Sequence, residues 1–251
     1  MNPLNLDEVC EFVNENIVGF HRSRIKAVEE LSLHKLLKKN PYLLKAKNLI
    51  APYDLIGSLF DAFLSSSEEK SFGDFLEGLA IFIAKKTNSG HKSSAPGIDL
   101  EFINKGIHYL VSIKSSTNWG NSSQQDRLEQ DMKNATIRLK QSRFGMNVQP
   151  VLGICYGRTG TSYVRGYLKV VGQNFWYLIS ENKNLYTDII EPIGYHAQEH
   201  TESFIIEKTS LVSRLTRQFF DEFCTPDLKI DWVKLVEFNS GNFDLDHFGK
   251  E

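Results

Sequence analysis

The chain has 251 residues, of which 41% are hydrophobic and 24% are charged, and its formal net charge is -2. These values are typical of a globular protein and exclude a strongly basic chain, so any nucleic-acid site must come from local clusters of basic residues. Cys10, Cys155 and Cys224 lie far apart, which fits neither a zinc site nor a disulfide framework. We expect free thiols in a reducing cytoplasm, no signal peptide and no membrane span.

The first part of the chain shows the residue spacing of helices. Apolar residues recur every three or four positions between residues 9 and 20, which predicts an amphipathic helix. Pro41 and Pro52 interrupt the helical patterns, and a further helix is predicted over residues 53–64. The serines and acids of residues 65–69 then predict the N-terminal cap of a new helix.

That new helix, predicted over residues 72–86, carries Glu77 at the edge of its apolar stripe. Gly73, Ala80 and Ala84 lie on the same side of the helix as Glu77. Small residues beside a carboxylate let another element approach closely, which makes Glu77 a candidate functional residue. The alternative is that Glu77 is an ordinary solvated side chain.

Two short apolar segments predict a β-hairpin. They are Gly97–Phe102 and His108–Lys114, and Asn104–Gly106 between them has the composition of a tight turn. Alternate residues of a strand share one face, so Ser112 and Lys114 point the same way while their neighbours point into a core.

The predicted hairpin brings candidate catalytic groups together. Asp99 on the first strand and Lys114 at the end of the second can meet above the sheet, with Ser112 beside them. This arrangement suits metal-assisted phosphodiester cleavage, because an aspartate supplies oxygen ligands to Mg²⁺ and a lysine can orient or activate the attacking water. Glu77 can reach the same place if its helix packs against the sheet, and Glu101 is a further candidate carboxylate. The alternative is a pair of solvated surface charges.

The segment after Lys114 is locally basic and rich in amide side chains. Between Lys114 and Arg143, six basic residues accompany three acidic ones, and a helix is predicted over residues 122–142. Basic groups neutralise phosphates and amides contact base edges, so we expect binding to duplex DNA. The alternative is a solvated amphipathic helix, and Trp119 can equally be a core anchor. The candidate DNA contacts are Asn118, Trp119, Asn121, Gln124, Gln125, Arg127 and Lys133.

The rest of the chain predicts strands followed by helices. Residues 151–156 are typical of a strand buried on both faces. The order of the elements predicts an α/β fold with a mixed β-sheet flanked by helices. The other predicted elements are a turn over residues 157–162, a strand over 163–171, a helix or strand over 175–179, a long helix over 201–223 and a short helix over 231–238.

Several short segments, taken in order, carry a family resemblance. They are Ser71–Gly73 with Leu76 and Glu77, Ile98–Asp99, Leu110–Lys114, Val151–Gly157, Tyr163–Gly166, Phe175–Trp176 and Trp232–Glu237. Together they resemble type II restriction endonucleases of the PD-(D/E)XK superfamily, and most of all the group that cuts interrupted GC-rich palindromes of the GGNCC kind.

The chain departs from the superfamily pattern at two positions. Ile98 stands before Asp99, where the superfamily name implies proline. Ser112 stands two residues before the lysine, where the superfamily usually has an acid. Serine does not supply a carboxylate's charge, so another acid must ligate the metal. Glu77 is the first choice, and Glu129 and Asp126 are alternatives.

The resemblance implies a homodimeric, Mg²⁺-dependent endonuclease that cuts both strands of double-stranded DNA at a short palindrome. Asp99 and Glu77 would bind the metal, Lys114 would position or deprotonate the water, and Ser112 would contact phosphate or the hydration water of the metal. A cognate methyltransferase would be paired in function without binding. We expect the nuclease core at residues 67–225, a C-terminal helix and tail at 226–251, and an N-terminal helical region at 1–66 that either dimerises or clamps DNA.

Two other functions remain open from the sequence. One is a repair or recombination nuclease of the same fold that recognises DNA structure instead of sequence. The other is a DNA-binding protein without catalysis, which the missing acid at position 112 favours slightly.

Overall fold

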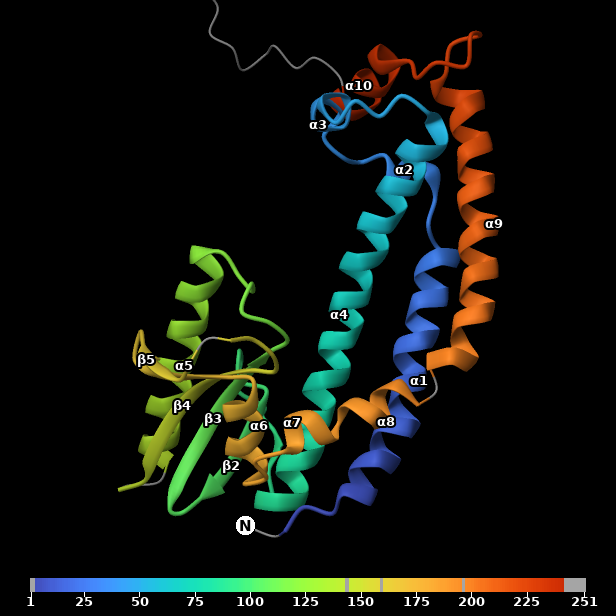
Figure 1. The fold of residues 1–251 in the computed structure, drawn as a ribbon. Coiled ribbons are helices and arrows are strands. Elements are labelled where there is room, and N and C mark those ends of the chain that lie inside the picture. The colour runs from blue at the N-terminus through green and yellow to red at the C-terminus, as the bar shows by residue number, and fades with distance from the viewer. Residues whose placement is uncertain (1–2, 143–144, 159, 196, 242–251) are drawn as a thin grey trace, which may run out of the picture. The chain divides into compact units, whose positions relative to one another are not determined.

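A computed structural model describes residues 3–142, 145–158, 160–195 and 197–241 (Figure 1). The chain forms two compact units, each built from two separate stretches of sequence. The first unit comprises Met1–His21 and Glu69–Gln198, and the second comprises Arg22–Glu68 and Glu199–Glu251. Helices α1 (Leu6–Glu29) and α4 (Pro52–Asn88) each contribute residues to both units.

The second unit is helical. Its core is made of aliphatic and aromatic side chains, among which Phe60 and Phe219 are fully buried. Asn40 caps the helix that begins at Pro41, and its side chain accepts hydrogen bonds from the backbone of Tyr42 and Leu43. Besides parts of α1 and α4, this unit contains α2 (Leu33–Leu36), α3 (Pro41–Ala46), most of α9 (Ala197–Phe223) and α10 (Trp232–Ser240).

The first unit contains a six-stranded mixed sheet, which confirms the predicted fold class. The strand order is β1-β2-β3-β4-β6-β5, in which β3, β4 and β6 are parallel and the other pairs are antiparallel. The strands are β1 (His91–Lys92), β2 (Leu100–Asn104), β3 (Ile107–Lys114), β4 (Asn147–Ile154), β5 (Ser162–Val164) and β6 (Tyr167–Val171).

Helices cover both faces of this sheet (Figure 1). Helix α5 (Ser122–Ser142) covers one face, where its Leu128 packs in one cluster with Leu110 of β3. The first part of α1, the last part of α4 and α6 (Gln173–Ser180) cover the other face, where Leu79 packs in one cluster with Val111. Since alternate residues point to opposite faces, Ser112 and Lys114 lie on the face that α5 covers. Two short helices, α7 (Leu185–Asp188) and α8 (Ile190–Gly194), complete the unit.

The predicted hairpin between β2 and β3 is confirmed. Lys105 and Gly106 form its turn with φ angles of 51° and 76°, as a two-residue type I′ turn requires. Leu100 pairs with Val111, and the backbone N–H of Asp99 donates to the Val111 carbonyl at 2.8 Å. This bond holds Asp99 against β3, where the Ser112 hydroxyl lies 3.4 Å from its carboxylate.

The predicted helix boundary at residues 65–69 is wrong, because α4 continues from Pro52 to Asn88. The hydroxyl of Ser66 donates to the Ala62 carbonyl at 3.0 Å, one turn back within the helix, instead of capping a new start. The segment contains no proline or glycine, so its backbone remains compatible with a helix.

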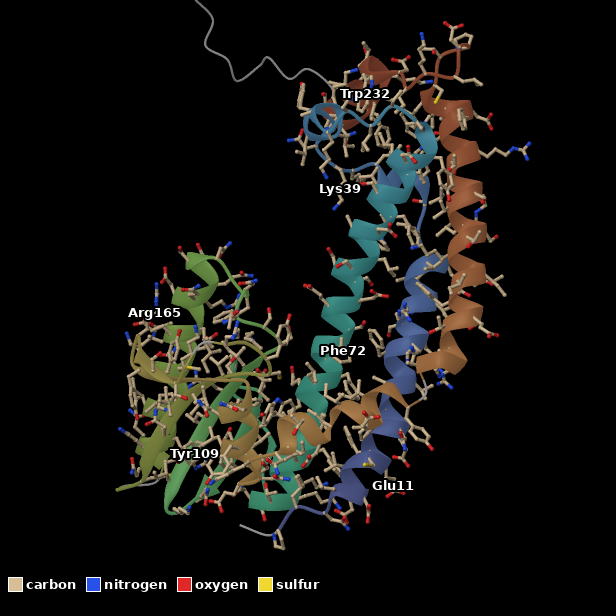
Figure 2. All side chains as sticks on the ribbon, in the orientation of Figure 1. Glu11, Lys39, Phe72, Tyr109, Arg165 and Trp232 are labelled. Atoms are coloured by element: carbon tan, nitrogen blue, oxygen red, sulfur yellow. The ribbon has the colours of Figure 1, made fainter. Side chains whose placement is uncertain are left out.

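The predicted single strand over residues 163–171 is also wrong. It is a hairpin of β5 and β6, whose turn residues Arg165 and Gly166 have φ angles of 49° and 83° (Figure 2). The segment 175–179, for which helix and strand were both open, belongs to helix α6.

Within the described ranges, no helix has both the length and the apolar character needed to cross a membrane.

Candidate active site

Asp99 and Lys114 meet at one end of the β2–β3 hairpin. The Asp99 Oδ2 atom accepts hydrogen bonds from the Ile113 backbone N–H at 2.6 Å and from the Ser112 hydroxyl at 3.4 Å. The Lys114 Nζ atom lies 4.0 Å from the same oxygen. The side chains of Asp99 and Lys114 are 23% and 32% exposed, so both groups remain accessible to solvent and to a ligand.

Lys114 is held by a second set of contacts. Its Nζ atom donates to the Ile113 carbonyl at 3.0 Å and lies 5.7 Å from the centroid of the Trp119 ring. Trp119 packs, partly buried, against the cluster beneath α5. Trp119 therefore acts in part as a core anchor, which was the alternative to its predicted DNA contact. Its ring also contacts the Lys114 ammonium group.

A pocket of about 380 Å³ opens beside these residues. We call it the Lys114 pocket. It combines two predicted catalytic residues with three of the predicted DNA contacts. Its lining residues are Gly97, Ser112, Lys114, Trp119, Gly120, Gln124, Arg127, Leu128 and Asp131.

Asp131 was missed by the sequence analysis. It lies on α5, and a Cβ atom added at Gly97 would come within 2.6 Å of its Oδ2 atom. Gly97 also has a φ of 73°, so this position both needs a left-handed backbone and leaves room for the carboxylate. One sequence signal could have found Asp131, because it lies one turn after Leu128 and directly before Met132, at the edge of the stripe that faces the sheet.

The two acids that the sequence analysis did consider on α5 lie in a different network. Glu129 Oε1 is 2.6 Å from Lys133 Nζ, and this hydrogen bond holds the pKa of Glu129 below its usual value. Arg165 forms ion pairs with both Asp126 and Glu129, and its bond to Asp126 raises the pKa of Arg165. Both alternatives for the missing acid are therefore engaged with the β5–β6 turn.

Glu77 lies on α4, which packs on the sheet face opposite to α5. Its carboxylate is 3.3 Å from Lys92 Nζ. Helix α4 approaches the end of β3 at Gly73, where an added Cβ would lie 3.6 Å from that of Ser115. Between these elements, burial raises the pKa of the Cys155 thiol to about 12, and the charge of Glu77 raises it while that of Lys114 lowers it.

Glu101, the further candidate carboxylate, is engaged elsewhere on the α5 face. Its Oε2 atom is 3.0 Å from His108 Nε2, and its Oε1 atom accepts from the Ser93 hydroxyl at 2.5 Å. The side chains of Glu101 and His108 are 15% and 7% exposed, which indicates a structural network.

The predicted DNA contacts before α5 have identifiable local roles. Asn121 and Gln124 form a reciprocal cap in which each side-chain oxygen accepts from the other's backbone N–H, at 3.0 and 3.1 Å. Gln125 donates to the Gly120 carbonyl at 3.4 Å, and Asn118 is exposed. These contacts fix the loop beside the Lys114 pocket. Of the two basic candidates on α5, Lys133 pairs with Glu129, while Arg127 is 84% exposed.

The donor set fits a hard cation that shares its ligands with substrate. No group of three or more His, Cys, Asp or Glu side chains is placed to hold a metal within the described part of the chain. Mg²⁺ does not require one, because it is bound by one or two carboxylates together with waters and substrate phosphates. The partly exposed Asp99 carboxylate, with the Ser112 hydroxyl beside it, meets this minimum.

Comparison with known families identifies the family of the chain. A family model described as "Type II restriction endonuclease EcoO109I" matches residues 7–201, which include the β2–β3 hairpin, the Lys114 pocket and all of α5. Among curated proteins, none matches the chain. The match covers well over half of the sequence, and the mixed α/β fold is consistent with it. The chain therefore belongs to the EcoO109I family of type II restriction endonucleases and is a site-specific deoxyribonuclease.

Proposed function

We propose that this restriction endonuclease is a Mg²⁺-dependent homodimer of the PD-(D/E)XK type that cuts both strands of DNA at a short, GC-rich palindrome. The observation that carries the proposal is the convergence of Asp99 and Lys114, whose charged atoms lie 4.0 Å apart at one end of the β2–β3 hairpin beside the Lys114 pocket.

The roles of the residues follow from their chemistry. Asp99 holds the cation, which when bound neutralises charge on the phosphate and stabilises the leaving oxygen. Lys114 orients the attacking water, whose oxygen bonds to phosphorus and releases a proton to solvent. The bond to the leaving sugar oxygen breaks, and that oxygen takes up a proton from a solvent water. Ser112 donates a hydrogen bond to Asp99 or to phosphate. Glu77 remains a candidate for the second carboxylate from the α4 side.

The surface around the Lys114 pocket supports contact with duplex DNA. Trp119, Gln124 and Arg127 line the pocket, and Asn118 and Gln125 lie in the adjoining polar segment. Amide and guanidinium groups are the donors that read base edges and phosphates. Substrate bound here would place its phosphate next to Lys114.

A homodimer follows from the proposed substrate, because symmetric cutting of a palindrome needs one active site for each strand. The second unit exposes large hydrophobic side chains of the kind that subunit interfaces bury, with Tyr42 at 70%, Ile50 at 75% and Tyr53 at 59% exposure. They support dimerisation through the helical unit, and DNA clamping is the other role considered for it.

Digestion of unmethylated phage DNA in Mg²⁺ tests the proposal. We expect discrete fragments whose sequenced ends share one short palindrome, with both strands cut at symmetric positions, and no cutting when Mg²⁺ is chelated. Smears or nicks confined to branched DNA would instead indicate a structure-specific nuclease. Cutting in the presence of chelator would contradict the metal dependence.

A further inference from the structure

The strands of the candidate site carry one carboxylate fewer than the superfamily pattern, because Ser112 stands where that pattern has an acid. Ser112 occupies the strand position beside Asp99, its side chain is buried, and its hydroxyl lies 3.4 Å from Asp99 Oδ2. A hydroxyl is a neutral ligand and does not offset the charge of a cation. Asp99 alone meets the minimum for Mg²⁺, and a second carboxylate from another element would complete the one or two that Mg²⁺ takes from a protein.

Asp131 is the carboxylate that lines the pocket beside Ser112. It lines the Lys114 pocket together with Ser112 and Lys114, and both of these residues contact Asp99. The closeness of Gly97 to Asp131 Oδ2 shows that α5 packs tightly against the chain two residues before Asp99. Asp131 thus shares a pocket with the two β3 side chains that Asp99 contacts, and it comes from a different element.

The Asp131 carboxylate is also available for a ligand. Its side chain is 22% exposed, and its ion pair with Arg127 has an N···O distance of 3.9 Å, which is beyond hydrogen-bonding range. By contrast, Glu129 on the same helix is held at 2.6 Å by Lys133 and also pairs with Arg165. Arg127 is 84% exposed, so it can leave Asp131 at little cost and turn toward DNA phosphate.

We propose that Asp131 is the second carboxylate ligand of the divalent cation, supplied by α5 in place of an acid at Ser112. This inference rests on the proposed function and extends it. A ligand can move from a strand to a neighbouring helix because the cation responds to the position and charge of the oxygen atoms, whichever element carries them.

Binding of Mn²⁺ to the full-length protein, followed by electron paramagnetic resonance of the free ion, tests the assignment without relying on activity. We expect Asp131→Asn and Asp99→Asn each to weaken Mn²⁺ binding about tenfold or more. The matched comparison is Glu129→Gln, on the same helix with a similar side-chain exposure of 25%, which should stay within about twofold of wild type. Glu77→Gln tests the rival ligand on α4.

A second substitution reports direct ligation and guards against a misfolded asparagine variant. Asp131→Cys places a soft thiolate in the site, so its affinity should fall for Mn²⁺ and rise for Zn²⁺ relative to wild type. A structural role for Asp131 would weaken binding of both ions alike. Wild type contains the other three cysteines and therefore provides the Zn²⁺ baseline.

The outcomes separate this inference from the proposed function. If wild type binds Mn²⁺ and cuts DNA while Asp131→Asn binds Mn²⁺ equally well, the assignment of Asp131 is overturned and the proposed function stands. The same holds if Glu77→Gln or Glu129→Gln loses Mn²⁺ binding and Asp131→Asn does not. If wild type neither binds Mn²⁺ nor cuts DNA with it, the proposed function fails and the inference fails with it.

Discussion

The Asp99–Lys114 pair is poorly suited to stabilising the fold. Its charged atoms are 4.0 Å apart, and both side chains are partly exposed. Ion pairs in such surroundings contribute about 0–1 kcal/mol to stability, because solvent screens them. The ion pair therefore adds little to folding, and substitution of Lys114 is expected to affect activity far more than stability.

Cys155 gives a residue-scale prediction that depends on pH. Burial raises the pKa of its thiol to about 12, whereas the pKa of an unfolded cysteine is about 8.5. The neutral thiol therefore stabilises the folded protein fully below about pH 8.5, and this contribution is lost as the pH rises toward 12. We expect the unfolding free energy to fall more steeply with pH above 8.5 in wild type than in Cys155→Ala, measured by urea denaturation.

Alkylation provides the control for the state of Cys155. In the native protein at pH 8, iodoacetamide should label the partly exposed Cys10 and leave Cys155 unmodified, as peptide mass spectrometry would show. Labelling of both thiols at equal rates would contradict the buried, protonated state of Cys155.

At the scale of elements, residue patterns correctly predicted the structures that depend on neighbouring residues alone. The alternation of residues along 108–114 predicted which side chains of β3 share a face. The turn composition at residues 104–106 predicted the hairpin. The errors at residues 65–69 and 163–171 have one cause. Serine caps and β-branched runs are weak signals of structure. At residues 65–69 the long helix α4 continues through the serines, and at residues 163–171 a turn of Arg165 and Gly166 divides the expected strand.

Two glycines in the first unit give predictions of opposite sign. Gly106 has a φ of 76° in the hairpin turn, so Gly106→Ala should destabilise the protein by about 1–2 kcal/mol. Gly78 lies inside α4 with open space around an added Cβ, so Gly78→Ala should stabilise it by about 0.5–1 kcal/mol. Thermal unfolding of both variants measures the difference, and equal shifts of Tm would contradict the turn geometry.

At the scale of the whole molecule, the sequence predicted the fold class, and it singled out residues that the structure brings together at the candidate site. Asp99, Ser112 and Lys114 come from adjacent segments, so the hairpin alone brings them together. The place of Asp131 in the Lys114 pocket depends on how α5 packs against the chain at Gly97, which is a tertiary contact that residue patterns do not show. Each of the two units likewise joins stretches that are distant in sequence, which residue patterns do not show.

The measurement that tests the central claim most directly compares Lys114→Ala with wild type in two assays on one DNA substrate. The claim is that Asp99 and Lys114 together carry out metal-dependent hydrolysis. Mg²⁺-dependent cutting should fall by about 10²–10⁴-fold, while DNA binding with Ca²⁺ in place of Mg²⁺ stays within a few-fold. Lys85→Ala, an exposed lysine of α4, should leave both unchanged. Undiminished cutting by Lys114→Ala would contradict the claim.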